Sequence, residues 1–86
     1  TDTSIISSIT NFFGFVAFNM YETRKTDYDE EELEQIFNDF NTKFNCTYLF
    51  EDLIKMLSNS TIFCKNSLNL YSFNGVYFYY YFAISS

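Results

Sequence analysis

The carboxylates of this chain are concentrated in one short segment. Residues 26–39, TDYDEEELEQIFND, hold seven of the eleven acidic residues and contain no Lys or Arg. The net charge of the chain is −6, and without those seven acids four acids would face five bases. Carboxylates can transfer protons, hold hard cations or meet a basic surface, so these three kinds of chemistry are the first to consider.

Catalytic and ligand-binding patterns are missing from the sequence. The chain contains no His, which excludes His-based acid–base catalysis and the triads and dyads that depend on it. Its two glycines, Gly14 and Gly75, are too few for a phosphate-binding loop. Its two cysteines, Cys46 and Cys64, do not form a zinc-binding cluster. We therefore expect neither an enzyme nor a cofactor or metal site.

The acidic segment is predicted to lie on a helix. Thr26 is the expected N-cap, with Asp29 at the position where a capping box has Glu or Gln. Apolar side chains then recur at helical spacing along one face, namely Leu33, Ile36, Phe37, Phe40 and Phe44. This stripe would face a core and leave the carboxylates in solvent.

The expected helix explains only part of this charge. Acids in its first turn complement the helix dipole by about 0.3–1 kcal/mol each, which accounts for Asp27, Asp29 and in part Glu30. Four acids lie further along: Glu31, Glu32, Glu34 and Asp39. Like charges at i,i+4, such as Asp27 with Glu31, cost about 0.2–0.5 kcal/mol per pair. Glu30 and Glu34 form a second such pair. A solvated face and a recognition face for a basic partner both fit this pattern.

Two further elements are predicted on either side of the acidic helix. Residues 11–22, NFFGFVAFNMYE, are mainly apolar on both alternating faces, which is typical of a strand covered on both sides. Residues 48–57 carry an apolar stripe at helical spacing. The short connection between this stripe and the acidic helix predicts a helical hairpin.

The last part of the chain is predicted to form a β-hairpin. Asn74-Gly75 is a strong signal for a two-residue turn, here between residues 67–73 and 76–84. Residues 62–65 either begin the first of these strands or form a separate short one. The predicted element order is therefore β-α-α-β-β. It describes an α+β fold with about three antiparallel strands and the helical hairpin packed on one face.

The predicted strand over residues 76–84 is rich in tyrosine. Its alternation would place five residues in the core under the helices: Val76, Phe78, Tyr80, Phe82 and Ile84. Tyr77, Tyr79 and Tyr81 would point the other way. Either the N-terminal segment covers them, or they form an interface in a homodimer or with a partner. The net charge and the lack of a basic groove argue against stacking on single-stranded nucleic acid, so direct nucleic-acid binding is not expected.

The sequence predicts a single domain over residues 1–86 without a membrane-spanning helix, and it leaves open whether a leader peptide has been removed. Residues 12–21 and 76–84 are apolar, but each is about half of the ~20 residues that a membrane-spanning helix needs. Residues 1–10, TDTSIISSIT, lack the basic region of a signal peptide and are expected to be frayed or an edge segment. Cys46 and Cys64 are expected to be reduced rather than bonded. We therefore expect a cytoplasmic protein, in the host cell if it is viral.

A concentrated negative field is what a protein needs to meet a basic surface. Seven charges over about 18 Å of helix correspond to roughly one per 2.6 Å, against about 1.7 Å for B-DNA. We therefore expect a small binding protein that blocks a basic, nucleic-acid-handling partner as a partial nucleic-acid mimic. In size, charge and lack of catalytic motifs it resembles the small phage and mobile-element inhibitors of restriction or CRISPR systems.

The expected partner surface combines charge with aromatic side chains. Its contact residues are Glu30, Glu31, Glu32, Glu34 and Asp39, with Asp27 at the rim and Tyr77, Tyr79 and Tyr81 as a second, apolar surface. Two alternatives stay open. An immunity protein that neutralises a toxin nuclease would use the same negative field. A structural or assembly subunit would instead oligomerise through its aromatic sheet.

Overall fold

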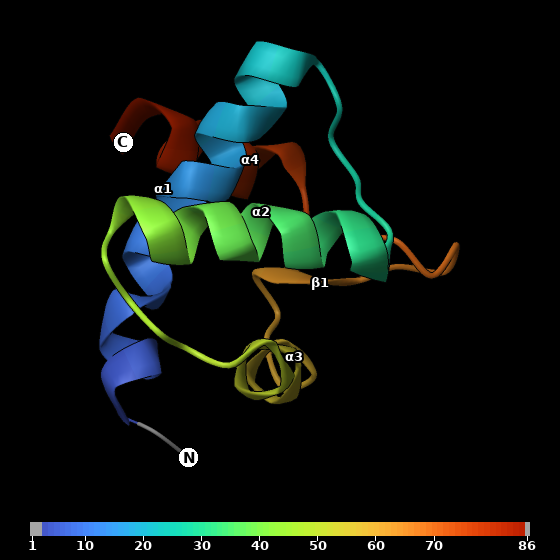
Figure 1. The fold of residues 1–86 in the computed structure, drawn as a ribbon. Helices are drawn as coiled ribbons and strands as arrows, with labels where there is room; N and C mark the ends of the chain where they lie inside the picture. Colours follow the sequence, from blue (N-terminus) through green and yellow to red (C-terminus); the bar gives the residue numbers. More distant parts are fainter. Residues whose placement is uncertain (1–2, 86) are drawn as a thin grey trace.

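Four helices and one two-stranded sheet make up the described part of the chain, residues 3–85, in a computed structural model (Figure 1). In chain order the elements are α1 (Thr3–Thr23), α2 (Glu30–Lys43), α3 (Phe50–Leu57), β1 (Phe63–Lys65), β2 (Tyr71–Phe73) and α4 (Val76–Ser85). The predicted α+β class is confirmed. The predicted order β-α-α-β-β and the three-stranded sheet are wrong, because the order is α-α-α-β-β-α with two strands.

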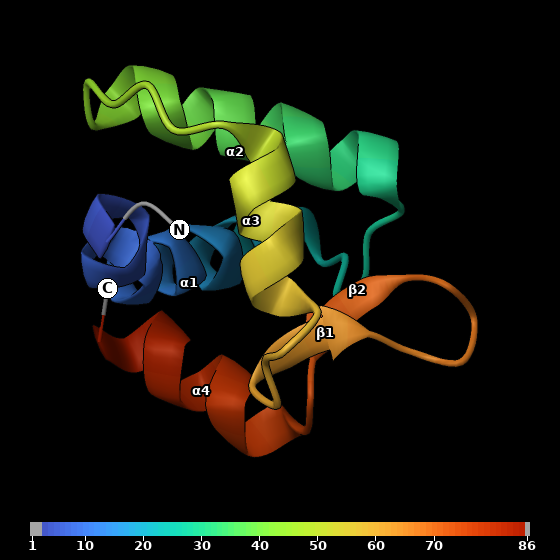
Figure 2. The same ribbon diagram turned by 90° about the horizontal axis from the view of Figure 1, so that it is seen from below.

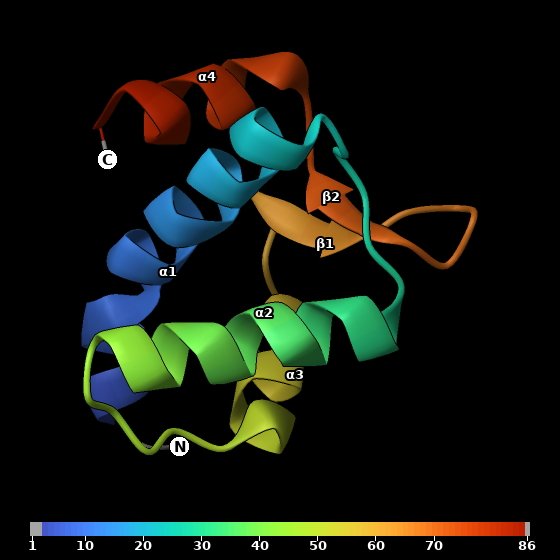
Figure 3. The same ribbon diagram turned by 45° about the horizontal axis from the view of Figure 1, so that its top comes forward.

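Helix α1 is the central element of the fold. It runs between α2 on one side and α4 on the other (Figures 2 and 3). Its most extensive packing is against α4, and it also contacts α2 and α3. The β-hairpin closes one end of the molecule, where β1 packs on α3 and β2 packs on α4. No helix within residues 3–85 has the length and apolar character needed to cross a membrane.

Two neighbouring residues of α1 divide the aromatic core. Phe12 makes edge-on contacts with Phe37 and Phe40 of α2, with ring centroids 5.5 and 5.4 Å apart. Phe13 faces the other side, where its ring lies 5.8 Å from Phe63 of β1 and 5.3 Å from Phe82 of α4. Successive residues of a helix point about 100° apart, so α1 buries two faces against two different layers.

The strand predicted over residues 11–22 is wrong, because these residues belong to α1. Apolar residues on both alternating faces indicate burial on two sides, and a helix between two layers produces the same pattern. The segment predicted as frayed or as an edge begins α1 from Thr3 onward, and Ile5 is already buried. Thr1 and Asp2, which the same prediction covered, lie outside the described residues.

The acidic helix is confirmed, but it begins later than predicted. Its N-cap is Asp29 and not Thr26. Tyr28 is held in an extended backbone bridge to Tyr71, with N···O distances of 3.0 and 2.7 Å, so the chain before Asp29 cannot be helical. The predicted apolar stripe is buried from Leu33 to Phe40, whereas Phe44, beyond the last turn, is partly exposed.

The second predicted helix is confirmed as α3, which covers residues 50–57 of the predicted 48–57. The two helices do not form a side-by-side hairpin. In Figure 1, α3 is seen end-on while α2 lies across the view, so the helices cross. Their contact includes Phe37 and Phe50, whose ring centroids are 5.9 Å apart.

The predicted hairpin around Asn74-Gly75 is wrong. β2 pairs with β1, in a register that aligns Phe73 with Phe63, and residues 76–85 form α4. Residues 62–65 thus contain a separate short strand, one of the two predicted alternatives. The hairpin turn lies at residues 66–70, where the Asn66 side chain accepts two backbone N–H groups and Asn69 adopts φ 61°. Gly75 adopts φ 105°, as a turn residue can, but its turn leads into a helix.

Candidate functional site

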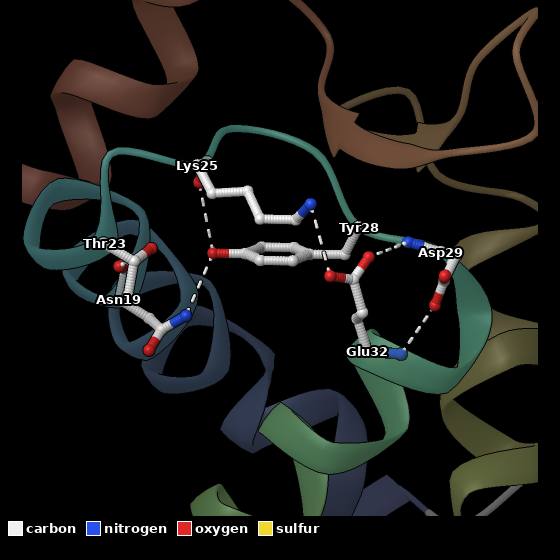
Figure 4. Close-up of polar contacts among 6 residues, drawn as sticks. All are labelled: Asn19, Thr23, Lys25, Tyr28, Asp29 and Glu32. Carbon is white, nitrogen blue, oxygen red and sulfur yellow. Dashed lines mark hydrogen bonds and ion pairs between the residues drawn. The ribbon is translucent and has the colours of Figure 1, made fainter.

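The start of α2 is fixed by three charged side chains (Figure 4). The Asp29 carboxylate accepts the N–H of Glu32 at 2.8 Å, and the Glu32 carboxylate accepts the N–H of Asp29 at 2.9 Å. The other oxygen of Glu32 lies 3.2 Å from the Lys25 ammonium. Hydrogen bonding to Glu32 and its charge raise the pKa of Lys25. Both carboxylate oxygens of Glu32 are therefore engaged at the start of the helix. Glu32 is for this reason a weaker candidate for a partner contact than its neighbours Glu30 and Glu31.

Tyr28 attaches the loop before α2 to the central helix. Its hydroxyl accepts a hydrogen bond from the Asn19 side chain at 3.0 Å and donates one to the carbonyl of Lys25 at 3.2 Å (Figure 4). Burial raises the pKa of this phenol. With the backbone bridge to Tyr71, these bonds hold α2 in a fixed position relative to α1 and β2.

The observed helix start changes how the acidic residues are interpreted. Glu30, Glu31 and Glu32 form the first turn of α2, so the helix dipole explains more of the charge than the sequence predicted. Asp27 lies outside the helix, and the predicted i,i+4 repulsion between Asp27 and Glu31 is therefore wrong. Glu30 and Glu34 do lie one turn apart on α2. Neither of them, nor Glu31, forms an ion pair with any residue in the described range 3–85.

A groove between α2 and the start of α3 brings charge and apolar surface together. It has a volume of about 570 Å³ and is lined by Glu30, Glu34, Leu49, Phe50, Glu51, Ile54 and Lys55. Glu51 was not among the residues predicted as contacts. Its place in the first turn of the second predicted helix was visible in the sequence, but the crossing that brings it beside α2 was not. We call this surface the acidic groove.

Of the six acids predicted as contacts, only Glu30 and Glu34 line the acidic groove. Glu31 and Glu32 lie beside them in the first turn of α2, and the other two lie further away. Asp39 is near the other end of α2 and accepts a hydrogen bond from Gln35 at 3.2 Å. Asp27 is half-buried beside β2 and the start of α4, where it lines a pocket with Ser72 and Val76. The predicted acidic ribbon therefore does not form one continuous contact surface.

The tyrosine-rich segment exposes a different face than its predicted alternation implied. Because it is helical, side chains repeat every 3.6 residues instead of every two. Phe82 is buried as predicted, but Val76, Tyr80 and Ile84, which were assigned to the core, are exposed. Of the three tyrosines predicted at the surface, Tyr77 and Tyr81 are exposed, whereas Tyr79 is partly buried.

The exposed side of α4 continues onto α1. A groove of about 340 Å³ runs between the two helices and is lined by Phe18, Tyr21, Tyr79, Tyr80, Ala83 and Ile84. Neither Phe18 nor Tyr21 was predicted to be at the surface. We call Val76, Tyr77, Tyr80, Tyr81 and Ile84 of α4, together with Phe18 and Tyr21 of α1, the aromatic face.

The remaining chemistry of the molecule is limited. Nowhere in residues 3–85 do three His, Cys, Asp or Glu side chains gather in a way that could hold a metal ion. Cys46 and Cys64 are free and only partly buried. No protein-family model matches the sequence, and no curated protein or solved structure is significantly similar to it. The function therefore has to be argued from the acidic groove and the aromatic face.

Proposed function

We propose that this protein is a small binding protein that blocks a basic surface on a nucleic-acid-handling protein, and that the acidic groove makes the contact. The observation that carries the proposal is the meeting of Glu30, Glu34 and Glu51 at one groove. Glu30 and Glu34 come from α2 and Glu51 from α3, so two crossing helices supply the three carboxylates.

The floor of the acidic groove suits basic side chains. Lys and Arg carry long apolar stems under their charged heads, and such stems pack on apolar surface while the heads stay polar. Leu49 is 57% exposed at the groove, and Ile54 lies beside it. An arginine-rich segment would therefore lay its stems on Leu49 and Ile54 and direct its guanidinium groups toward the carboxylates.

One cation reduces the negative charge of the groove. Lys55 lines it together with the three carboxylates, which leaves an excess of two negative charges. On a chain with net charge −6 this excess adds to a field that speeds the approach of a basic partner. Electrostatic steering weakens as salt screens the charges, over a Debye length of about 8–10 Å near physiological ionic strength.

Nucleic-acid-handling proteins are the natural targets because their working surfaces are basic. A protein with this field would occupy such a surface in the cytoplasm of the host cell and exclude the nucleic acid. This is the mode of action expected of phage and mobile-element inhibitors, the class that the size and charge of the chain resemble.

The proposal is tested with two double variants that change the net charge equally. Glu30→Gln with Glu34→Gln removes two charges from the acidic groove, and Glu22→Gln with Asp39→Asn removes two elsewhere. The probe is an arginine-rich peptide, titrated at low salt and followed by NMR. We expect the groove variant to lose about tenfold in affinity, or about 1.4 kcal/mol, and the control to lose less than about threefold.

The same titration maps the contact. Shifts centred on α2 and α3 near Glu34 and Glu51 support the groove, and a panel of basic nucleases and DNA-binding proteins then identifies the target class. Equal losses in the two double variants, or shifts centred elsewhere, would reject the groove as the contact.

A further inference from the structure

Helix α4 is apolar around its whole circumference. Its ten residues, VYFYYYFAIS, include no charged side chain. One side is covered by the rest of the protein, with Phe82 buried and Phe78, Tyr79 and Ala83 partly buried. A helix that is apolar all round is normally buried all round. The opposite side of α4 is nevertheless exposed.

The exposed side of α4 has the spacing of a helix-packing surface. Five of its residues are more than half exposed: Val76, Tyr77, Tyr80, Tyr81 and Ile84. Tyr77, Tyr80, Tyr81 and Ile84 follow the i, i+3, i+4, i+7 pattern with which one helix contacts another. Ile84 is 83% exposed and Tyr77 is 74% exposed, so the pattern lies in solvent and not in the core.

The aromatic face is large enough for a stable interface. Its seven exposed side chains, these five with Phe18 and Tyr21, present on the order of 800 Å², if a whole aromatic side chain buries about 150–250 Å². A standard interface takes about 800 Å² from each partner. The largest apolar patch on a typical monomer is about 300–600 Å². The face therefore matches the area that one partner contributes to a dimer.

The shape of the aromatic face allows it to pair with itself. In a twofold dimer the same surface serves both partners, so it needs a ridge and a groove side by side. Tyr77 and Tyr81 are one turn apart and form a ridge, and the groove between α1 and α4 opens beside them at Tyr80. A second copy with its α4 antiparallel would set the ridge of each protomer against the groove of the other.

The distribution of charge favours a second copy over other occupants. Within residues 3–85, α4 has no charged side chain and α1 has one, Glu22 in its last turn. Two chains of charge −6 can meet at this face without bringing their acidic helices together, because α2 lies on the other side of α1 (Figure 2). A helix lying on a membrane surface usually carries Lys and Arg on its polar side, and α4 has neither.

From these observations we infer that the chain forms a twofold dimer through the exposed side of α4 and the adjoining surface of α1. This inference does not depend on the acidic groove, which stays open on the far side of each protomer. The occupant of the aromatic face is thus a second copy of this chain.

Sedimentation of the whole chain at increasing concentration tests the dimer. The expected mass is twice the 10.3 kDa of the monomer. Tyr80→Glu combined with Ile84→Glu should raise the dimer dissociation constant about 30-fold or more, because it puts like charges at the centre of the interface. Leu68→Glu is the control for an added surface charge, since Leu68 is 73% exposed but lies on the β-hairpin turn, and it should leave the dimer unchanged.

A second measurement does not depend on disruptive variants. Tyr80→Cys, in a chain with Cys46→Ser and Cys64→Ser, places a thiol near the expected twofold axis and should form an intermolecular disulfide rapidly on mild oxidation. A wild-type chain that stays monomeric at submillimolar concentration would overturn the inference. So would a dimer that Tyr80→Glu with Ile84→Glu leaves intact, or a monomer that binds to zwitterionic vesicles through this face.

Discussion

Helices α2 and α4 flank the same central helix, yet their outward faces have little in common. Each buries an aromatic stripe against α1, as the contacts of Phe12 with Phe37 and of Phe13 with Phe82 show. The outward side of α2 carries carboxylates, whereas that of α4 carries tyrosines and Ile84. Water solvates the first face well and the second poorly. The comparison indicates that both faces of α4, but only one face of α2, are adapted to packing.

The largest expected losses of stability come from removing the two rings with which α1 packs against its neighbouring layers. Phe12→Ala should lower the free energy of unfolding by about 3–5 kcal/mol, since the ring is fully buried between α1 and α2. Phe13→Ala should cost a similar amount on the α4 side. Hydrogen exchange distinguishes the layers, because the first variant should expose the amides of α2 first and the second those of α4. Identical exchange patterns would contradict the division of the core by these two rings.

A smaller effect tests where α2 begins. Asp29→Ala removes the side chain that caps the helix and should cost about 0.5–2 kcal/mol in urea unfolding. Thr26→Ala should change stability by less than about 0.5 kcal/mol, because Thr26 lies in the loop. A larger loss for Thr26→Ala than for Asp29→Ala would place the cap where the sequence alone predicted it.

Alkaline pH should weaken the attachment of α2 to α1 through Tyr28. Burial raises the pKa of Tyr28 above its ordinary value of 10.0, so the folded state favours the neutral phenol. Stability is then fully present below the ordinary pKa and is lost as pH rises through the folded value. In unfolding measured above pH 10.0, Tyr28→Phe should reduce this loss of stability. Part of the loss should remain, because burial also raises the pKa of Tyr71.

The smallest effect concerns the exposed carboxylates themselves. Glu34→Gln removes the like-charge pair with Glu30 and should stabilise the monomer by about 0.2–0.5 kcal/mol. Adding salt should stabilise the wild-type chain and reduce the difference in stability between the two proteins.

Glu31→Lys with Glu34→Lys should keep or increase the stability of the fold while lowering the association rate with a basic protein. An unchanged association rate would contradict the role proposed for the acidic groove.

The sequence predicted α2 and α3, the two elements in which apolar residues recur at helical spacing on one face. Leu33, Ile36, Phe37 and Phe40 lie along one stripe, and only a helix places them together. The prediction failed for α1 and α4 because both are apolar on more than one side, and such segments have no distinguishing period. The Asn-Gly pair added to the error, since the positive φ of Gly75 suits any tight turn and does not require a second strand.

The sequence predicted which kinds of residue the candidate sites contain, but not how the fold groups them. The sequence placed negative charge near residue 30 and aromatic surface near residue 80, and both are exposed there. Glu51, Phe18 and Tyr21 were missed because they join those surfaces through helix crossings that no local pattern encodes. The structure places Asp27 before the helix and gives Glu32 a role in the cap, because the position of the N-cap decides which acids serve local structure.

The three-layer order of α4, α1 and α2 also affects the protein before any contact is made. Every charged residue in the described range 3–85 falls between Glu22 and Lys65, outside α4 and outside most of α1. The centre of negative charge is therefore displaced from the centre of mass toward α2. Near a positively charged surface this displacement exerts a torque, which turns the molecule until α2 leads and α4 trails. The protein would thus arrive already oriented.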